Sequence, residues 1–329
     1  MVKVFEKNMG LQVTLIVVAL GLLWCRALIA PPAMMAGDKS AILYDLVYRG
    51  LGPMPRLATI LAMTLVLVEG VMLNLLLSNV GVVSQKSLLP TLLYIIAMSA
   101  SAKTLTPMLL VNAALIPCLN QLLLRGSLLT IPTNKICGAT MLIGLATMFY
   151  FPAWTLVISY LLIAVNYRLY GWKDWCVMIL GLIGPYLLLG TVLMMTGDLA
   201  DAWMAIVEKF NDFAIRIDTV DMLRTCASLF LMLLFVVSLV SLWSKLGERT
   251  IIWQKNASTV MLLTVGGICM MFYAQLVPVD MQMVGVPFAL VANHFLAPDK
   301  RRYYGLGKKN HDWIFDILLI LTLVAALIC

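Results

Sequence analysis

Long apolar runs recur from one end of the chain to the other, and they constrain the fold more than any other feature. The first covers residues 10–30 and the second residues 57–79. Each is close to the ~20 residues that a helix needs to cross a bilayer. Inside a bilayer a segment must satisfy its own backbone hydrogen bonds, which a helix does. The pattern therefore predicts an all-α, polytopic membrane protein built as a transmembrane helical bundle.

Counting every apolar segment gives about eleven spans, several of them short and paired around a proline. After the first two, the expected spans are 88–102, 106–124, 138–150, 152–167, 175–196, 224–244, 259–273, 281–297 and 313–328. Gly184-Pro185 predicts a break in the span at 175–196. The stretches between the spans are too short for a soluble domain, so we expect residues 1–329 to form a single integral membrane domain.

The distribution of charge indicates how the chain lies in the membrane. Charged side chains make up only 12% of the residues, and the basic ones are spread over short loops. The positive-inside rule then places the N-terminus in the cytoplasm, and loops 31–56 and 197–223 together on the outer surface. No basic cluster with interleaved aromatic residues of the kind that binds nucleic acid occurs, and the basic residues favour membrane lipids as partners.

Both outer loops contain stretches that would form amphipathic helices lying at the membrane interface. In the first loop the charged edge would hold Asp38, Asp45 and Arg49, and the apolar face would hold Ile42, Leu43, Leu46 and Val47. The second loop has an apolar stripe at Trp203, Ile206, Val207, Phe210 and Phe213. It is net negative, through Asp198, Asp201, Glu208, Asp212, Asp218 and Asp221. These acids fit either a solvated surface or the attraction of a divalent cation.

Glu69 is the sharpest polar signal inside a predicted span. A carboxylate in the middle of a membrane is costly unless it is protonated, paired or facing a watery cavity. It fits a proton relay, a cation ligand, a partner for Arg26, or simply a hydrogen bond between helices. Glu69 is therefore a candidate substrate-binding residue, and the basis for a lipid or solute transporter as one alternative function.

The order Gly37-Asp38, Tyr44-Asp45 and Gly52-Pro53 resembles the first outer loop of GT-C membrane glycosyltransferases, which transfer sugars from polyprenyl-phosphate donors. The resemblance implies catalytic roles for Asp38, as the base, and Asp45. The donor phosphate would then be neutralised by Arg26, Arg49, Arg56 or Lys103. The chain departs from the family at Lys39, where a second acid is usual, and we expect no soluble C-terminal domain of the kind that many members carry. No metal ligand is assigned, and a divalent cation stays a possible cofactor.

A second resemblance covers residues 142–186, through motifs such as Phe149-Tyr150-Phe151-Pro152 and Gly171-Trp172-Lys173-Asp174-Trp175. These motifs are similar to an uncharacterised family of multi-pass proteins of the bacterial inner membrane, which is the location we expect here. A carotenoid-cleavage label found in that family needs several histidine ligands for iron, and this chain has two histidines. That label is therefore excluded. Two alternatives to a transferase stay open: a transporter that uses Glu69, and a non-enzymatic subunit of an envelope-biogenesis complex.

Overall fold

The structure is a computed structural model that describes residues 9–36, 41–80, 87–124, 131–169, 171–196, 199–211, 222–244, 247, 250–274, 281–296 and 312–328. Throughout these ranges the regular structure is helical, and no strand occurs in them. This confirms the all-α prediction. The helices are α2 (Met9–Ile29), α3 (Ile42–Leu51), α4 (Pro55–Val80), α5 (Leu89–Ser99), α6 (Pro107–Leu122), α7 (Thr133–Phe149), η1 (Phe151–Trp154), α8 (Thr155–Asn166), α9 (Trp172–Thr196), α10 (Leu199–Asn211), α11 (Met222–Ser244), α12 (Ile251–Ala274), η3 (Met281–Val284), α13 (Gly285–Leu296) and α14 (Asp312–Ile328).

Among the described residues, four helices are long and apolar enough to cross a membrane by length and composition. They cover Met9–Ile29, Pro55–Val80, Trp172–Met195 and Cys226–Ser244. Five shorter apolar helices accompany them, between Leu89 and Leu327. The protein is therefore a membrane protein. The number of spans that the sequence predicts, about eleven, stays a prediction.

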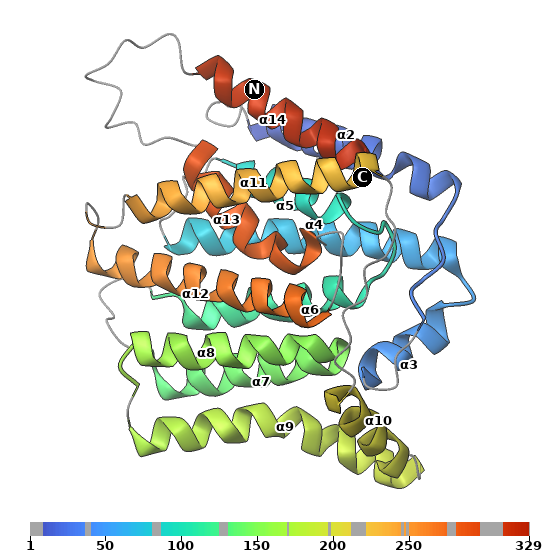
Figure 1. The fold of residues 1–329 in the computed structure, drawn as a ribbon, viewed down its shortest axis with the longest axis vertical. Coiled ribbons are helices and arrows are strands. Elements are labelled where there is room, and N and C mark those ends of the chain that lie inside the picture. Colours follow the sequence, from blue (N-terminus) through green and yellow to red (C-terminus); the bar gives the residue numbers. More distant parts are fainter. Residues whose placement is uncertain are drawn as a thin grey trace.

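The long helices lie side by side with their axes roughly aligned, from α14 and α2 at one edge to α9 at the other (Figure 1). Helix α7 packs between α6 and α9, α12 packs on α8, and α11 packs on both α13 and α14. Helices α3 and α10 lie at the same end of this array (Figure 1), as expected for the two loops assigned to one side. We call it the α3 end. Helix α11 ends and α12 begins at the opposite end (Figure 1).

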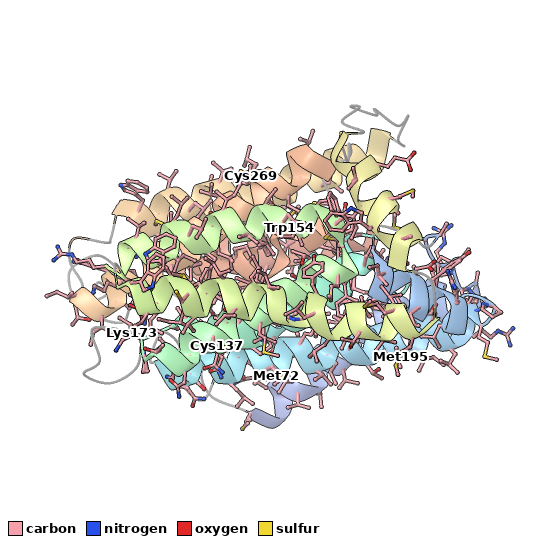
Figure 2. The ribbon with its side chains drawn as sticks, turned by 90° about the horizontal axis from the view of Figure 1, so that it is seen from below. Met72, Cys137, Trp154, Lys173, Met195 and Cys269 are labelled. Atoms are coloured by element: carbon pink, nitrogen blue, oxygen red, sulfur yellow. The ribbon has the colours of Figure 1, made fainter. Side chains whose placement is uncertain are left out.

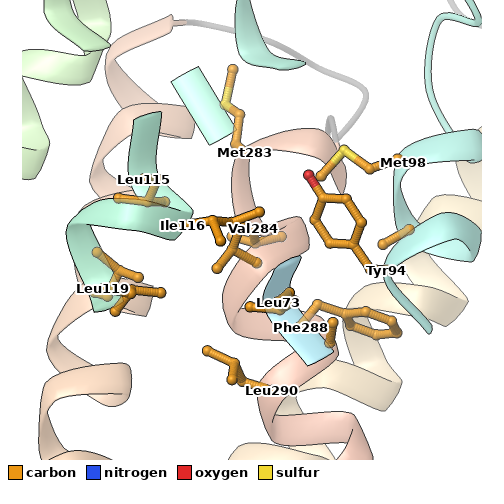
Figure 3. Packing of buried hydrophobic residues seen from close by; sticks show 14 of the residues in the cluster. Leu73, Tyr94, Met98, Leu115, Ile116, Leu119, Met283, Val284, Phe288 and Leu290 are labelled. Carbon is orange, nitrogen blue, oxygen red and sulfur yellow. The ribbon is translucent and has the colours of Figure 1, made fainter. Parts of the chain in front are cut away.

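Two short helices form the centre of the molecule. Every residue of α5 is buried, and so is every residue from Met281 to Asn293 in η3 and α13. Helix α5 packs directly on α13, and α4 covers α5 from outside. Tyr94 of α5, Phe288 of α13 and Leu73 of α4 converge in this core (Figure 3). Such complete burial explains why these helices carry apolar residues on every side and no single polar face.

The predicted break at Gly184-Pro185 is wrong, because α9 runs unbroken from Trp172 to Thr196 with Pro185 inside it. Lys173 and Met195 mark its two ends (Figure 2). The helix is held next to the proline: the Tyr186 and Thr147 hydroxyl oxygens are 2.7 Å apart, and the rings of Tyr186 and Trp154 are 6.1 Å apart. Membrane helices tolerate proline where such neighbours compensate for the lost backbone bond.

Two further expectations about helices need correction. Helix α12 begins at Ile251 rather than at residue 259, so its first two turns include polar residues that hydropathy had assigned to a loop. The amphipathic helix expected in the first loop is present as α3, but its buried face is partly misassigned. Leu46 is 70% exposed, whereas Tyr44 is buried and Val47 packs against the core. The helix thus turns its aromatic side toward the protein.

Candidate functional site

The turn between α5 and α6, residues 100–106, is the best-anchored polar segment at the α3 end. On the side of α2, the Trp24 indole donates a hydrogen bond to the Ser99 hydroxyl at 2.9 Å, just before the turn. Both side chains are buried, so this bond lies away from water and is costly to leave unmade. The end of α5 is therefore fixed to the first long helix.

Gln282 of η3 anchors the same turn from the core. Its amide donates to the carbonyls of Met98 at 3.4 Å and Ala102 at 3.3 Å, and its oxygen accepts from the Thr106 hydroxyl at 2.6 Å. The Asn112 amide donates to the Gln282 backbone carbonyl at 2.8 Å. Carbonyls at the end of a helix lack intrahelical partners, so Gln282 satisfies groups that α5 leaves open. The turn is held by segments nearly 180 residues apart in sequence.

Tyr44 connects the first loop to this turn. Its hydroxyl lies 3.1 Å from the Met35 carbonyl and 3.3 Å from the Leu105 carbonyl, and it donates to both. Burial, with a smaller contribution from Tyr48, raises the pKa of Tyr44 to about 12, so the hydroxyl keeps the proton that it donates. Met34 and Ala41 are buried as well. The chain on both sides of segment 37–40 is therefore attached to the protein.

Several charged residues that the sequence singled out lie on α3, at the start of α4, in the turn 100–106 and at the end of α2. On α3, the Arg49 guanidinium contacts the Asp45 carboxylate at 2.7 Å, because the two residues are four positions apart along the helix. Arg56 lies exposed in the first turn of α4, and Lys103 is half-buried in the turn. Arg26 lies exposed in the last turn of α2. Asp38, the predicted base, lies outside the described residues.

Together these elements form what we call the loop platform: α3, the start of α4 and the turn 100–106. It presents four cationic side chains, if Arg26 at the end of α2 is included, and one carboxylate that is already ion-paired. Such a set is suited to an anionic group such as a phosphate, because guanidinium and ammonium groups are its usual partners in proteins. The carboxylate of Asp45 is thus paired with Arg49 on the same helix.

Glu69 occupies a separate place, inside the core. Its carboxylate is 3% exposed and accepts a hydrogen bond from the Tyr94 hydroxyl at 2.5 Å. Its other oxygen, Oε1, has no hydrogen-bond partner among the described residues. The proposed partnership with Arg26 is wrong, because Arg26 is exposed while Glu69 is bonded to Tyr94 across the α4–α5 contact. Glu69 thus belongs to a different site from the loop platform.

The remaining expectations concern metal ions and the second loop. In the described part of the chain, no group of three or more histidine, cysteine or acidic side chains is placed to hold a metal ion. The second loop does form an amphipathic helix, α10, with Trp203 and Val207 exposed on its surface. Most of its acids, including Asp198, lie outside the described residues or within α10 where the side chain is not described. The divalent cation stays a prediction.

The residues that build the platform were mostly not found by sequence reasoning. Trp24, Tyr44 and Gln282 act through partners that are 61 to 184 residues away, so no local pattern reveals them. One signal was available: Gln282 is an amide within an apolar run, and polar groups in such runs usually have a specific partner. Comparison with protein-family models, with curated proteins and with solved structures gave no match.

Proposed function

We propose that this protein is a GT-C-like glycosyltransferase that uses a polyprenyl-phosphate-linked sugar in the assembly of an envelope glycan or glycoprotein. In this proposal it is a bundle of about eleven spans in a bacterial inner membrane, with a cytoplasmic N-terminus and the loop platform facing outward. The observation that carries the proposal is the bond from Tyr44 to the Leu105 carbonyl. It joins the loop that contains Asp38 to the turn that contains Lys103.

The chemistry requires a base and a set of cations at one place. The acceptor hydroxyl attacks the anomeric carbon of the sugar while the bond between that carbon and the phosphate oxygen breaks. Asp38 takes the hydroxyl proton, and the polyprenyl phosphate leaves with the bonding electrons. Arg56 and Lys103, with Arg49 held by Asp45, stabilise the charge on the departing phosphate. A lipid donor suits a site at the ends of membrane helices, since its tail can stay in the bilayer.

The experiment is complementation in the native host with an Asp38→Asn variant, scored by the profile of envelope glycans. Asp174→Asn is the matched control, because Asp174 lies in the first turn of α9, at the opposite end from α3. Both variants are checked for normal abundance by immunoblot. We expect loss of a glycan with Asp38→Asn alone. A normal profile, in a host where deletion of the whole gene does change it, would remove Asp38 as the base.

A second candidate function, a lipid transporter, is favoured by Glu69. A buried carboxyl with one oxygen unpartnered in the described structure is a group that can exchange a proton or ligand in the membrane. The test is scrambling of fluorescent phosphatidylglycerol in proteoliposomes, followed by dithionite quenching. Glu69→Gln should abolish it and Glu208→Gln, on exposed α10, should not. Equal quenching in protein-free liposomes would eliminate this candidate.

A further inference from the structure

Helices α11 and α12 are consecutive in the chain, yet each packs mainly on other helices. Helix α11 packs on α13 and α14, while α12 packs on α8 and η3, and the short α13 lies between the two long ones (Figure 1). In the described residues a groove opens at this place. The space in it that is open to the centre of a water-sized sphere is about 40 Å³. Its walls are largely formed by Leu77, Leu242, Trp253, Ala257, Leu290 and Val291.

The exposed surface of α11, which contributes Leu242 to the groove, is apolar. Its outward side chains are large, and Val236, Val240 and Trp243 are at least half exposed. An exposed apolar surface of this kind, on a helix of spanning length, is the surface that lipid tails contact. The groove is thus a recess in the lipid-facing surface, located where α11 ends and α12 begins.

The polar side chain in the groove is already satisfied. Asn256 donates to the Leu124 carbonyl at 3.0 Å and accepts from the Leu124 amide at 2.9 Å, so its amide closes the floor and offers little to a polar ligand. What remains is an aliphatic recess with an indole at its rim. A recess of that composition binds a hydrocarbon chain in preference to a sugar, a peptide or an ion.

Basic residues are close in sequence to the end of the recess. The segment between α11 and α12, most of which lies outside the described residues, contains Lys245 and Arg249 against a single acid, Glu248, and Lys255 follows in the second turn of α12. The Lys255 ammonium lies 5.8 Å from the centre of the Tyr167 ring, which holds it at this end of the helices. Basic residues next to the end of a membrane helix attract anionic headgroups. Trp253 is a residue type that prefers the headgroup level.

We propose that the recess between α11 and α12 binds an anionic phospholipid, with one acyl chain in the groove and the headgroup near Lys255. The site lies at the end of the molecule away from the loop platform, and it is independent of the proposed transferase reaction. It therefore concerns a resident lipid of the membrane leaflet on the α11–α12 side, not the sugar donor.

The first test is the amount of phospholipid that stays bound after purification in detergent, measured by native mass spectrometry. Ala257→Phe fills the groove, because Ala257 is 7% exposed and lines it. Val240→Phe is the matched control, since it adds the same ring to the outward face of α11, where Val240 is 64% exposed. We expect about tenfold less bound phosphatidylglycerol in Ala257→Phe only, which corresponds to ~1.4 kcal/mol. Equal retention in both variants would overturn the proposal.

A second measurement keeps the test decisive if Ala257→Phe does not fold. The wild-type protein is reconstituted in nanodiscs with acyl-brominated phosphatidylglycerol or acyl-brominated phosphatidylcholine, and the fluorescence of Trp253 is obtained by subtracting a Trp253→Phe sample. We expect stronger quenching by the anionic lipid, and loss of that preference in Lys255→Gln. Equal quenching by the two lipids would show that Trp253 contacts only bulk bilayer, and would overturn the proposal.

Discussion

Replacing Tyr44 by phenylalanine removes a hydroxyl that joins the first loop to the turn 100–106. The ring is 2% exposed, and phenylalanine fills the same space, so the apolar packing of α3 is retained. What is lost is the bond shared between the carbonyls of Met35 and Leu105, at 3.1 and 3.3 Å. The substitution thus separates the attachment of the loop from the burial of its helix.

The magnitude follows from the number of groups left without a partner. One hydroxyl proton serves two carbonyls, so the loss amounts to one net hydrogen bond plus the cost of a poorly satisfied buried carbonyl, ~1–2 kcal/mol. A change of that size alters the population of an open state by a factor of about 5–30. We therefore expect the amides of α3 to exchange with solvent about 5–30 times faster in Tyr44→Phe.

The assay is hydrogen–deuterium exchange of the protein in nanodiscs, followed by mass spectrometry of peptides that cover residues 42–51. Tyr160→Phe is the matched control, because the Tyr160 hydroxyl donates to the Ile136 carbonyl at 3.4 Å, between α8 and α7. It should leave exchange in α3 unchanged. Unchanged exchange in Tyr44→Phe, or equal acceleration in the two variants, would refute the role of Tyr44 as the attachment.

Three further predictions concern pH, packing and the core. The pKa of Tyr44 is raised from 10.0 to about 12, so its stabilising bond should be complete below about pH 10 and lost as the pH rises through 12, which exchange of α3 at stepped pH will reveal. Gly181→Ala should lower the free energy of unfolding, measured by melting in detergent, by ~1–3 kcal/mol, because the added methyl collides with α7. Gly184→Ala should leave it unchanged, because nothing lies within 4 Å of the added methyl, and equal effects of the two substitutions would contradict the packing of α9 on α7. Tyr94→Phe should cost ~1–3 kcal/mol in the same melting assay, since it removes the donor to Glu69, and an unchanged melting temperature would show that their bond contributes nothing.

Hydropathy predicted the class of fold because the energetic demand of the bilayer acts on each segment separately. It identified the long helices, such as α4, whatever their neighbours. It failed where a helix depends on its surroundings. Pro185 reads as a break, but contacts with α7 and η1 keep α9 intact. Asn256 reads as part of a loop, but its amide is bonded to the Leu124 backbone, so α12 continues through it.

The ion pair of the site was predictable from the sequence, and the hydrogen bonds that attach α3 to the rest of the protein were not. The spacing of Asp45 and Arg49 fixes their ion pair, because residues four apart on a helix are neighbours. The buried side of α3 was misjudged, since a helix with apolar residues on most of its circumference gives no sign of which part meets the protein. Only the position of Leu105, far along the chain, determines that Tyr44 points inward.

The central claim is that the loop platform transfers a sugar from a polyprenyl-phosphate donor, and release of polyprenyl phosphate by the purified protein tests it most directly. Protein in nanodiscs is incubated with radiolabelled polyprenyl-phosphate hexoses and a membrane extract as the source of acceptor. The account predicts release by the wild type and by Asp174→Asn. In Asp38→Asn it predicts a rate of release that is lower by a factor of about a hundred or more, as for loss of a general base. Equal release by Asp38→Asn, or none by the wild type above empty nanodiscs, would contradict it.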